Sequence, residues 1–142
     1  MKLEYQFDAS TDHAFLREYL VPGTPPRTKK FNKEMKSGTA SLVLLSVLAK
    51  AKEPMYGYLI AKQIEASSDG TSMIKQGALY PVLRSLESSG LLESQVEPST
   101  SGPPRRYYQI TELGRNSLLE WMDIWGKIRD FVEASLEGVS HD

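Results

Sequence analysis

The residues best suited to chemistry are two adjacent arginines, Arg105 and Arg106, which are followed by a pair of tyrosines. A guanidinium stays charged at every ordinary pH, and its flat fork of N–H groups matches a phosphate or a carboxylate. The residues just before the pair are rich in proline, glycine and serine, which indicates an exposed turn. This segment predicts anion binding. The alternative is a charged strand edge that deters pairing with other chains.

A second candidate is the stretch KQGALYPVLRSLESSGLL, from Lys75 to Leu92. Its apolar residues recur at helical steps and predict a helix that Gly90 ends. The inward face is expected to be Leu79, Val82, Leu83 and Leu86, and the outward face Gln76, Tyr80 and Arg84.

Two poor helix formers, Gly77 and Pro81, lie near the start of that helix. Glycine lets a backbone approach a ligand closely. Proline costs little in an opening turn, because the N–H groups there have no partner within the helix. Those N–H groups also carry partial positive charge, which suits a phosphate. Both residues are therefore tolerable if this end of the helix meets a ligand. The alternative is that Tyr80 only covers a neighbouring helix and that Arg84 is an ordinary solvated residue.

Catalysis is not indicated. The chain of 142 residues has no cysteine, which excludes disulfides, thiolate metal sites and a cysteine nucleophile. Its two histidines, His13 and His141, lie near the ends, and no metal spacing, nucleophile motif or glycine-rich phosphate loop is present. We expect no enzyme activity, no metal and no cofactor.

Charge is uneven along the chain, although the net charge is only −1. The segment Arg27–Lys36 has five basic residues and one acid, whereas the chain from Glu112 onward has seven acids and three bases. A nucleic-acid partner is therefore signalled by local basic segments and not by the total. No apolar run reaches the about 20 residues that span a membrane, and no signal peptide is evident, so we expect a cytoplasmic protein.

The elements that must position these residues follow from the hydrophobic spacing. Residues 1–36 are expected to form an arm with one short helix (13–20) and a Pro- and Gly-rich linker (21–36). Three helices should follow, over residues 37–51, 56–68 and about 76–88, then two strands, 91–96 and 106–110. The polar segment between the strands is expected to be an extended tip, too long for a tight turn. Residues 112–137 carry the pattern of a long helix.

This order predicts a mainly α fold with a small β-hairpin (α+β), a winged helix-turn-helix whose third helix enters the major groove of DNA. The predicted DNA-binding domain spans 37–111, and residues 112–142 form a helix and tail for dimerisation. Apolar residues on that last helix recur at steps of three and four, which is typical of a partner helix. They are Leu118, Trp121, Trp125, Ile128 and Val132. The alternative is that this stripe packs on the first helix of its own chain.

The motifs resemble those of the PadR family of winged-helix transcriptional regulators. They are Tyr56-Gly57-Tyr58, Gly77-Ala78-Leu79-Tyr80-Pro81-Val82-Leu83, Leu86-Glu87, Gly90-Leu91-Leu92, Arg105-Arg106-Tyr107-Tyr108 and Ile110-Thr111-Glu112-Leu113-Gly114. The resemblance implies a homodimeric repressor that binds a roughly palindromic double-stranded promoter site. It places Gln76, Tyr80 and Arg84 on the recognition helix and Arg105 and Arg106 on the wing. We also expect DNA contacts from Lys75 and Lys36.

Other functions stay open at this point. A winged helix can be a protein-interaction module that binds no DNA. Trp121 and Trp125 could stack a small aromatic effector, although interface packing is the commoner use of tryptophan. The layout also resembles a PadR-like modifier of the cyanobacterial circadian clock, which would act on clock gene expression.

Overall fold

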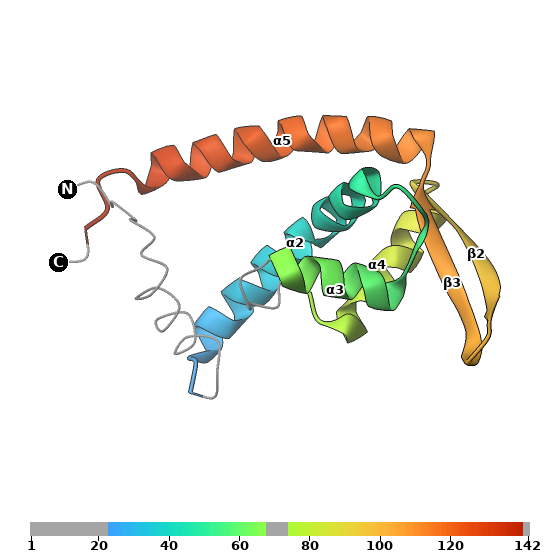
Figure 1. Cartoon of the computed structure of the whole chain (residues 1–142). Coiled ribbons are helices and arrows are strands. Elements are labelled where there is room, and N and C mark those ends of the chain that lie inside the picture. The colour runs from blue at the N-terminus through green and yellow to red at the C-terminus, as the bar shows by residue number, and fades with distance from the viewer. Residues whose placement is uncertain (1–22, 68–73, 141–142) are drawn as a thin grey trace. The chain divides into compact units, whose positions relative to one another are not determined.

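The structure, a computed structural model, describes residues 23–67 and 74–140 (Figure 1). The short helix expected at residues 13–20 lies outside this part of the chain. The elements in chain order are α2 (Pro26–Lys50), β1 (Met55–Tyr56), α3 (Gly57–Ser67), α4 (Gln76–Ser88), β2 (Leu92–Ser99), β3 (Gly102–Ile110) and α5 (Glu112–Leu136). They form the predicted winged helix-turn-helix followed by a long helix. No helix of the described ranges is both long and apolar enough to cross a membrane.

The chain divides into two compact units. The central unit, residues 36–123, holds the end of α2, the helices α3 and α4, the sheet and the start of α5. The terminal unit is described over residues 23–35 and 124–140.

Helix α2 begins at Pro26, well before the expected start at Ser37, so the prediction of a linker over residues 26–36 is wrong. Proline is favoured at the first position of a helix, where its missing N–H has no partner to lose. The following lysines and Glu34 are good helix formers because straight side chains keep most of their rotamer freedom there. The Nζ of Lys30 and the Oε1 of Glu34, one turn apart, are separated by 4.0 Å.

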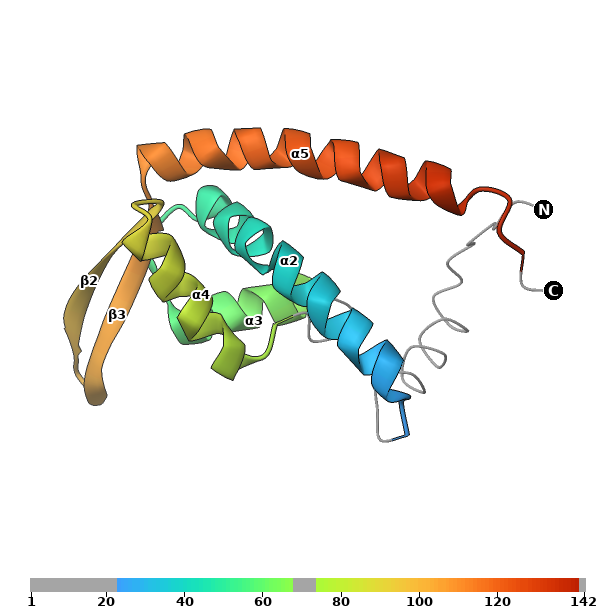
Figure 2. The same cartoon turned by 180° about the vertical axis from the view of Figure 1, so that it is seen from behind.

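The core lies between α2, α3, α4 and the sheet, which Figures 1 and 2 show packed together. The inward positions predicted for α4 are confirmed: Leu79, Leu83 and Leu86 are buried, and Val82 packs against them. For α3 the sequence predicts one apolar stripe of Tyr56, Leu59, Ile60 and Ile64; this is partly wrong, because Leu59 is 41% exposed while Ile60 and Ile64 are buried. Ile60 and Ile64 lie one turn apart and fill the core side, which leaves Leu59 beside them facing outward.

The sheet has three antiparallel strands in the order β1-β3-β2. The sequence did not predict β1, whose residues Met55 and Tyr56 pair with Tyr108 and Tyr107. Two residues are too few to show an alternating pattern, so only the partner strand defines them as a strand.

The predicted extended tip of the hairpin is also wrong. Strands β2 and β3 stay paired as far as Ser99 and Gly102, which leaves a tight turn. Between the pairs Glu97↔Arg105 and Ser99↔Gly102, β2 has only Pro98 while β3 has Pro103 and Pro104. A bulge of this kind accommodates prolines, because its extra residue lies outside the regular pairing.

The start of α5 is fastened to the junction of α4 and β2. Gly90 ends α4 with a φ of 80°, as predicted from its position. The N–H of Thr111 donates to the carbonyl oxygen of Leu91 (3.1 Å), and its hydroxyl donates to that of Gly90 (2.7 Å). The same hydroxyl accepts the N–H of Gly114 (3.0 Å), which makes Thr111 the N-cap of α5.

Gly114 is required by packing at this junction. A Cβ at this position would lie 2.1 Å from the Leu91 carbonyl oxygen and 2.7 Å from Cγ1 of Ile110. The nearest atom at Leu91 belongs to the backbone, so it cannot move out of the way by a change of rotamer.

We predict that Gly114→Ala lowers the free energy of unfolding by about 3 kcal/mol, because α5 must shift away from the sheet. Gly38→Ala in α2 is the matched control, since a Cβ there meets nothing within 4 Å. That variant should gain up to about 1 kcal/mol from the higher helix propensity of alanine. Chemical denaturation measures both, and equal effects would contradict the packing argument.

Candidate nucleic-acid interface

The first turn of α4 and the turn of the hairpin lie on one side of the central unit. Both point toward the lower edge in Figures 1 and 2, although the views differ by half a turn. Helix α4 contacts β2, and the side-chain bond between Glu87 and Ser94 joins the end of the helix to the start of the strand. A duplex that approached this side would meet both elements.

The N-terminus of α4 is open. Lys75 is the N-cap residue, exposed and without a side-chain cap, and Gln76 begins the helix. The side chain of Gln76 lies outside the described part of the structure. Gly77 is exposed, and a Cβ added to it would meet nothing within 4 Å. Side-chain crowding by the described residues therefore does not explain the glycine at this position.

Pro81 lies inside α4, beyond the first turn, so its expected place in the opening turn is wrong. The N–H that proline lacks would have bonded the carbonyl of Gly77 four residues earlier, and the proline ring crowds that same carbonyl. Glycine and proline at this spacing are therefore linked, because the flexible backbone of Gly77 can adjust to the ring of Pro81.

Tyr80 lies against the start of α3. A Cβ at buried Gly57 would be 2.7 Å from Cε1 of Tyr80 and 2.9 Å from its hydroxyl. The ring thus covers the neighbouring helix, as the alternative interpretation expected, yet 37% of Tyr80 remains exposed. This contact explains the glycine of the Tyr-Gly-Tyr motif, since only glycine leaves room for the ring.

The two arginines of the hairpin point to opposite faces of the sheet. Nη1 of Arg106 donates to Oγ of Ser94 (2.9 Å), and that hydroxyl donates to the carboxylate of Glu87 on α4. The guanidinium of Arg105 lies over the ring of Tyr56, with its Cζ 4.6 Å from the ring centre. Arg106 is therefore linked to α4 and Arg105 to β1.

Tyr108 is the buried tyrosine of the pair Tyr107-Tyr108, since alternate residues of a strand face opposite sides of the sheet, and its phenol is influenced by several charged groups. Burial raises the pKa of its phenol above 10.0, and the negative charge of Glu87 acts in the same direction. The positive charges of Arg106 and Arg84 act against this rise in pKa. Both arginines are exposed, and Arg106 is also joined to α4 through Ser94 and Glu87.

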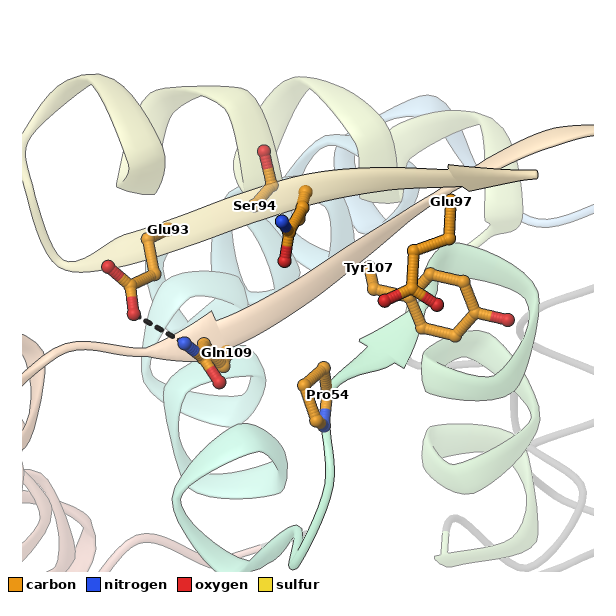
Figure 3. A pocket seen from close by; sticks show the side chains of 7 residues that line it. Pro54, Glu93, Ser94, Glu97, Tyr107 and Gln109 are labelled. Atoms are coloured by element: carbon orange, nitrogen blue, oxygen red, sulfur yellow. Dashed lines mark hydrogen bonds between the residues drawn. The ribbon is translucent and has the colours of Figure 1, made fainter.

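The outer face of the sheet has a different character. It carries an open hollow of about 360 Å³ between the sheet and Pro54 (Figure 3). Two carboxylates, Glu93 and Glu97, line this hollow beside Tyr107, and Gln109 donates to Glu93. Carboxylates repel a phosphate, so this face is unsuited to a DNA backbone.

The remaining predicted site residues lie on other helices. Lys36 is half-buried on α2. On α5, Leu118 is buried in the core of its own chain and Trp121 packs against that core. Trp125, Ile128 and Val132 are exposed. The structure therefore separates the stripe into an intrachain part and an exposed part.

Further exposed apolar residues on α5 had no place in the predicted stripe. They are Leu113, Leu119, Met122, Ile124, Phe131 and Leu136. Over the described residues no group of three His, Cys, Asp or Glu side chains could hold a metal ion.

Known proteins resemble this chain over most of its length. The model of the transcriptional regulator PadR-like family matches residues 44–120. An uncharacterized protein of Lysinibacillus sphaericus is 30% identical over 99 residues, which are 70% of this chain and 88% of that protein.

Solved structures resemble it as well. A PadR family transcriptional regulator from Eggerthella lenta is 30% identical, with a TM-score of 0.65 and coverage of 92% of this chain and 99% of that one. A transcriptional regulator from Clostridium thermocellum is 27% identical, with a TM-score of 0.64 and coverage of 71% and 93%.

We predict that Gly57→Ala costs about 1 to 3 kcal/mol of folding free energy, because the new methyl group collides with Tyr80. In a Tyr80→Ala background the same change should cost clearly less, since the ring that it strikes is gone. Urea denaturation of the four proteins in this cycle gives the coupling. Equal costs of Gly57→Ala in both backgrounds would show that the contact does not explain the glycine.

Proposed function

Because the chain belongs to the PadR-like family of transcriptional regulators, we propose that it binds double-stranded DNA as a homodimer and represses transcription. The family comprises regulators of transcription and not enzymes. The observation that carries the proposal is the pair of exposed cations Arg84 on α4 and Arg106 on the hairpin, where Arg106 is joined to α4 through Ser94 and Glu87. Two elements that converge in this way suit one phosphate-rich surface.

In this proposal α4 enters the major groove, as the third helix of a winged helix does. Lys75 and the first backbone N–H groups of α4 meet phosphates, while Gln76, Tyr80 and Arg84 face the bases. Gly77, where an added Cβ would meet no described atom within 4 Å, allows the close approach. Arg106 on the hairpin contacts the adjacent backbone. Lys36 on α2 adds a supporting contact.

Arg105 has a smaller part in this proposal. Its guanidinium already lies on the ring of Tyr56, a cation–π contact that would have to be given up or shared. We therefore assign the direct DNA contact of the wing to Arg106. In this proposal Arg105 stabilises the packing of the hairpin against β1 through its contact with Tyr56.

The proposed dimer is joined through α5. Trp125, Ile128 and Val132 are exposed in the single chain, with Ile128 51% and Phe131 73% exposed. An apolar surface of this kind needs a partner, and the acidic residues of α5 would keep it away from phosphates. Leu118 supports the interface only from within its own chain. Two wings related by a two-fold axis would read a roughly palindromic site with half-sites about one helical turn apart.

The other candidates have less support. Trp121 is engaged with the core, so an aromatic effector would meet mainly Trp125. A protein-interaction module that binds no DNA would give no reason for the exposed cations Arg84 and Arg106 on two adjoining elements. A role in circadian clock gene expression stays a prediction, because the names of the relatives described above mention only transcriptional regulation.

DNA binding is tested with the duplex that the wild-type protein enriches most strongly from a random-sequence library. We predict that Arg106→Ala and Arg84→Ala each weaken binding about tenfold. Each should also reduce the steepness of the plot of log affinity against log salt concentration by about 1, which corresponds to the loss of one phosphate contact. Lys52→Ala, which removes an exposed charge between α2 and β1, is the control and should change neither. Failure to enrich any duplex would overturn the proposed function.

The dimer is tested at Ile128. We predict that Ile128→Glu halves the molar mass measured by light scattering, because a buried unpaired carboxylate is costly at an interface. Helix content should stay unchanged, since residue 128 is exposed in the single chain. Asn116→Glu on an exposed site of the same helix is the control and should remain dimeric. A wild-type protein that is monomeric would refute the role of α5.

A further inference from the structure

We infer that Ser94 and Glu87 are positioning residues for Arg106: they aim its guanidinium so that the hairpin and α4 meet DNA as one body. This inference rests on the proposed function and deepens it, since it assigns the groups that direct the wing arginine. It depends on a short chain of hydrogen bonds that links α4, β2 and β3.

The chain of bonds uses the single proton and one of the two lone pairs of one hydroxyl. Ser94 donates its single proton to Glu87 of α4, and its oxygen accepts Nη1 of Arg106 at 2.9 Å. The half-buried hydroxyl thus lies between a carboxylate and a guanidinium, and charges of opposite sign polarise both bonds in the same sense. An alanine at position 94 could make neither of these bonds.

The bridge leaves Arg106 able to bind. A guanidinium has several N–H donors, and the bond to Ser94 occupies only one nitrogen, so the others can reach a phosphate. Arg106 is exposed on a hairpin, where a long side chain would otherwise sample many rotamers. Restricting it before binding reduces the conformational entropy that binding would cost.

The neighbouring arginine shows that this direction is specific. Arg105 lies on the opposite face, over Tyr56, and faces Glu97 across the strands. Only Arg106 is connected to α4. The position of the wing cation relative to the recognition helix is therefore set by Glu87, which lies on that helix itself.

A double-mutant cycle on the full chain tests the inference, with the enriched duplex described above and binding measured by fluorescence anisotropy over a range of salt. Ser94→Ala should weaken binding about fivefold, because a hydrogen bond to a charged group is lost. In an Arg106→Ala background the same substitution should cause no further loss. Ser94→Thr, which keeps the hydroxyl, should bind like the wild type.

Variants of the two carboxylates complete the test. Glu87→Gln keeps the shape but removes the charge, so it should weaken binding less than Ser94→Ala. It also replaces that variant if Ser94→Ala does not fold. Glu93→Gln, on the outer face, is the matched control and should not affect binding.

The outcomes separate the two proposals. If Arg106→Ala leaves affinity unchanged, the wing contact in the proposed function is wrong. If Arg106→Ala weakens binding but the effect of Ser94→Ala is absent or fully additive, the positioning role is overturned and DNA binding by Arg106 still stands.

Discussion

The arrangement of the whole central unit depends on the close packing of the first turn of α5 against the backbone at Gly90 and Leu91. Only glycine at position 114 permits it, because a Cβ would lie 2.1 Å from a carbonyl oxygen. Thr111 closes the same junction through three hydrogen bonds. Since α4 ends and both long strands meet there, this one contact sets the hairpin relative to α4. The relative position of residues on α4 and on the hairpin therefore depends on the packing at this junction.

Several motif residues have structural duties that are separate from binding. Gly57 accommodates the ring of Tyr80, and Tyr108 fills the space under α4. The exposed cations around them, Arg84 and Arg106, contribute little to the core. The motif therefore builds a rigid support, and the charged residues on it supply what could contact DNA. Tyr80 belongs to both groups, because it covers α3 and is still partly exposed.

Local patterns explain which elements were predicted well. The spacing of Leu79, Leu83 and Leu86 correctly indicated the inward face of α4, since helix periodicity is a local property. The start of α2 at Pro26 and the paired prolines of the hairpin were missed for the opposite reason. Proline was interpreted as a sign of a linker or an open loop, whereas the first turn of a helix and a bulge can each accommodate it. Strand β1 has no pattern of its own, so only its partner β3 reveals it.

From the sequence alone came the order of the elements, the stop at Gly90, the lack of catalytic groups and the family. The tertiary structure alone decided the surroundings of individual side chains: Leu118 packs in its own core, Tyr80 lies on Gly57, and each of the adjacent arginines has a different partner. The physical reason is that periodicity depends on neighbours in the chain, whereas the direction of a long side chain depends on partners distant in sequence. For Arg106 those partners are Ser94 and Glu87, and for Arg105 the partner is Tyr56.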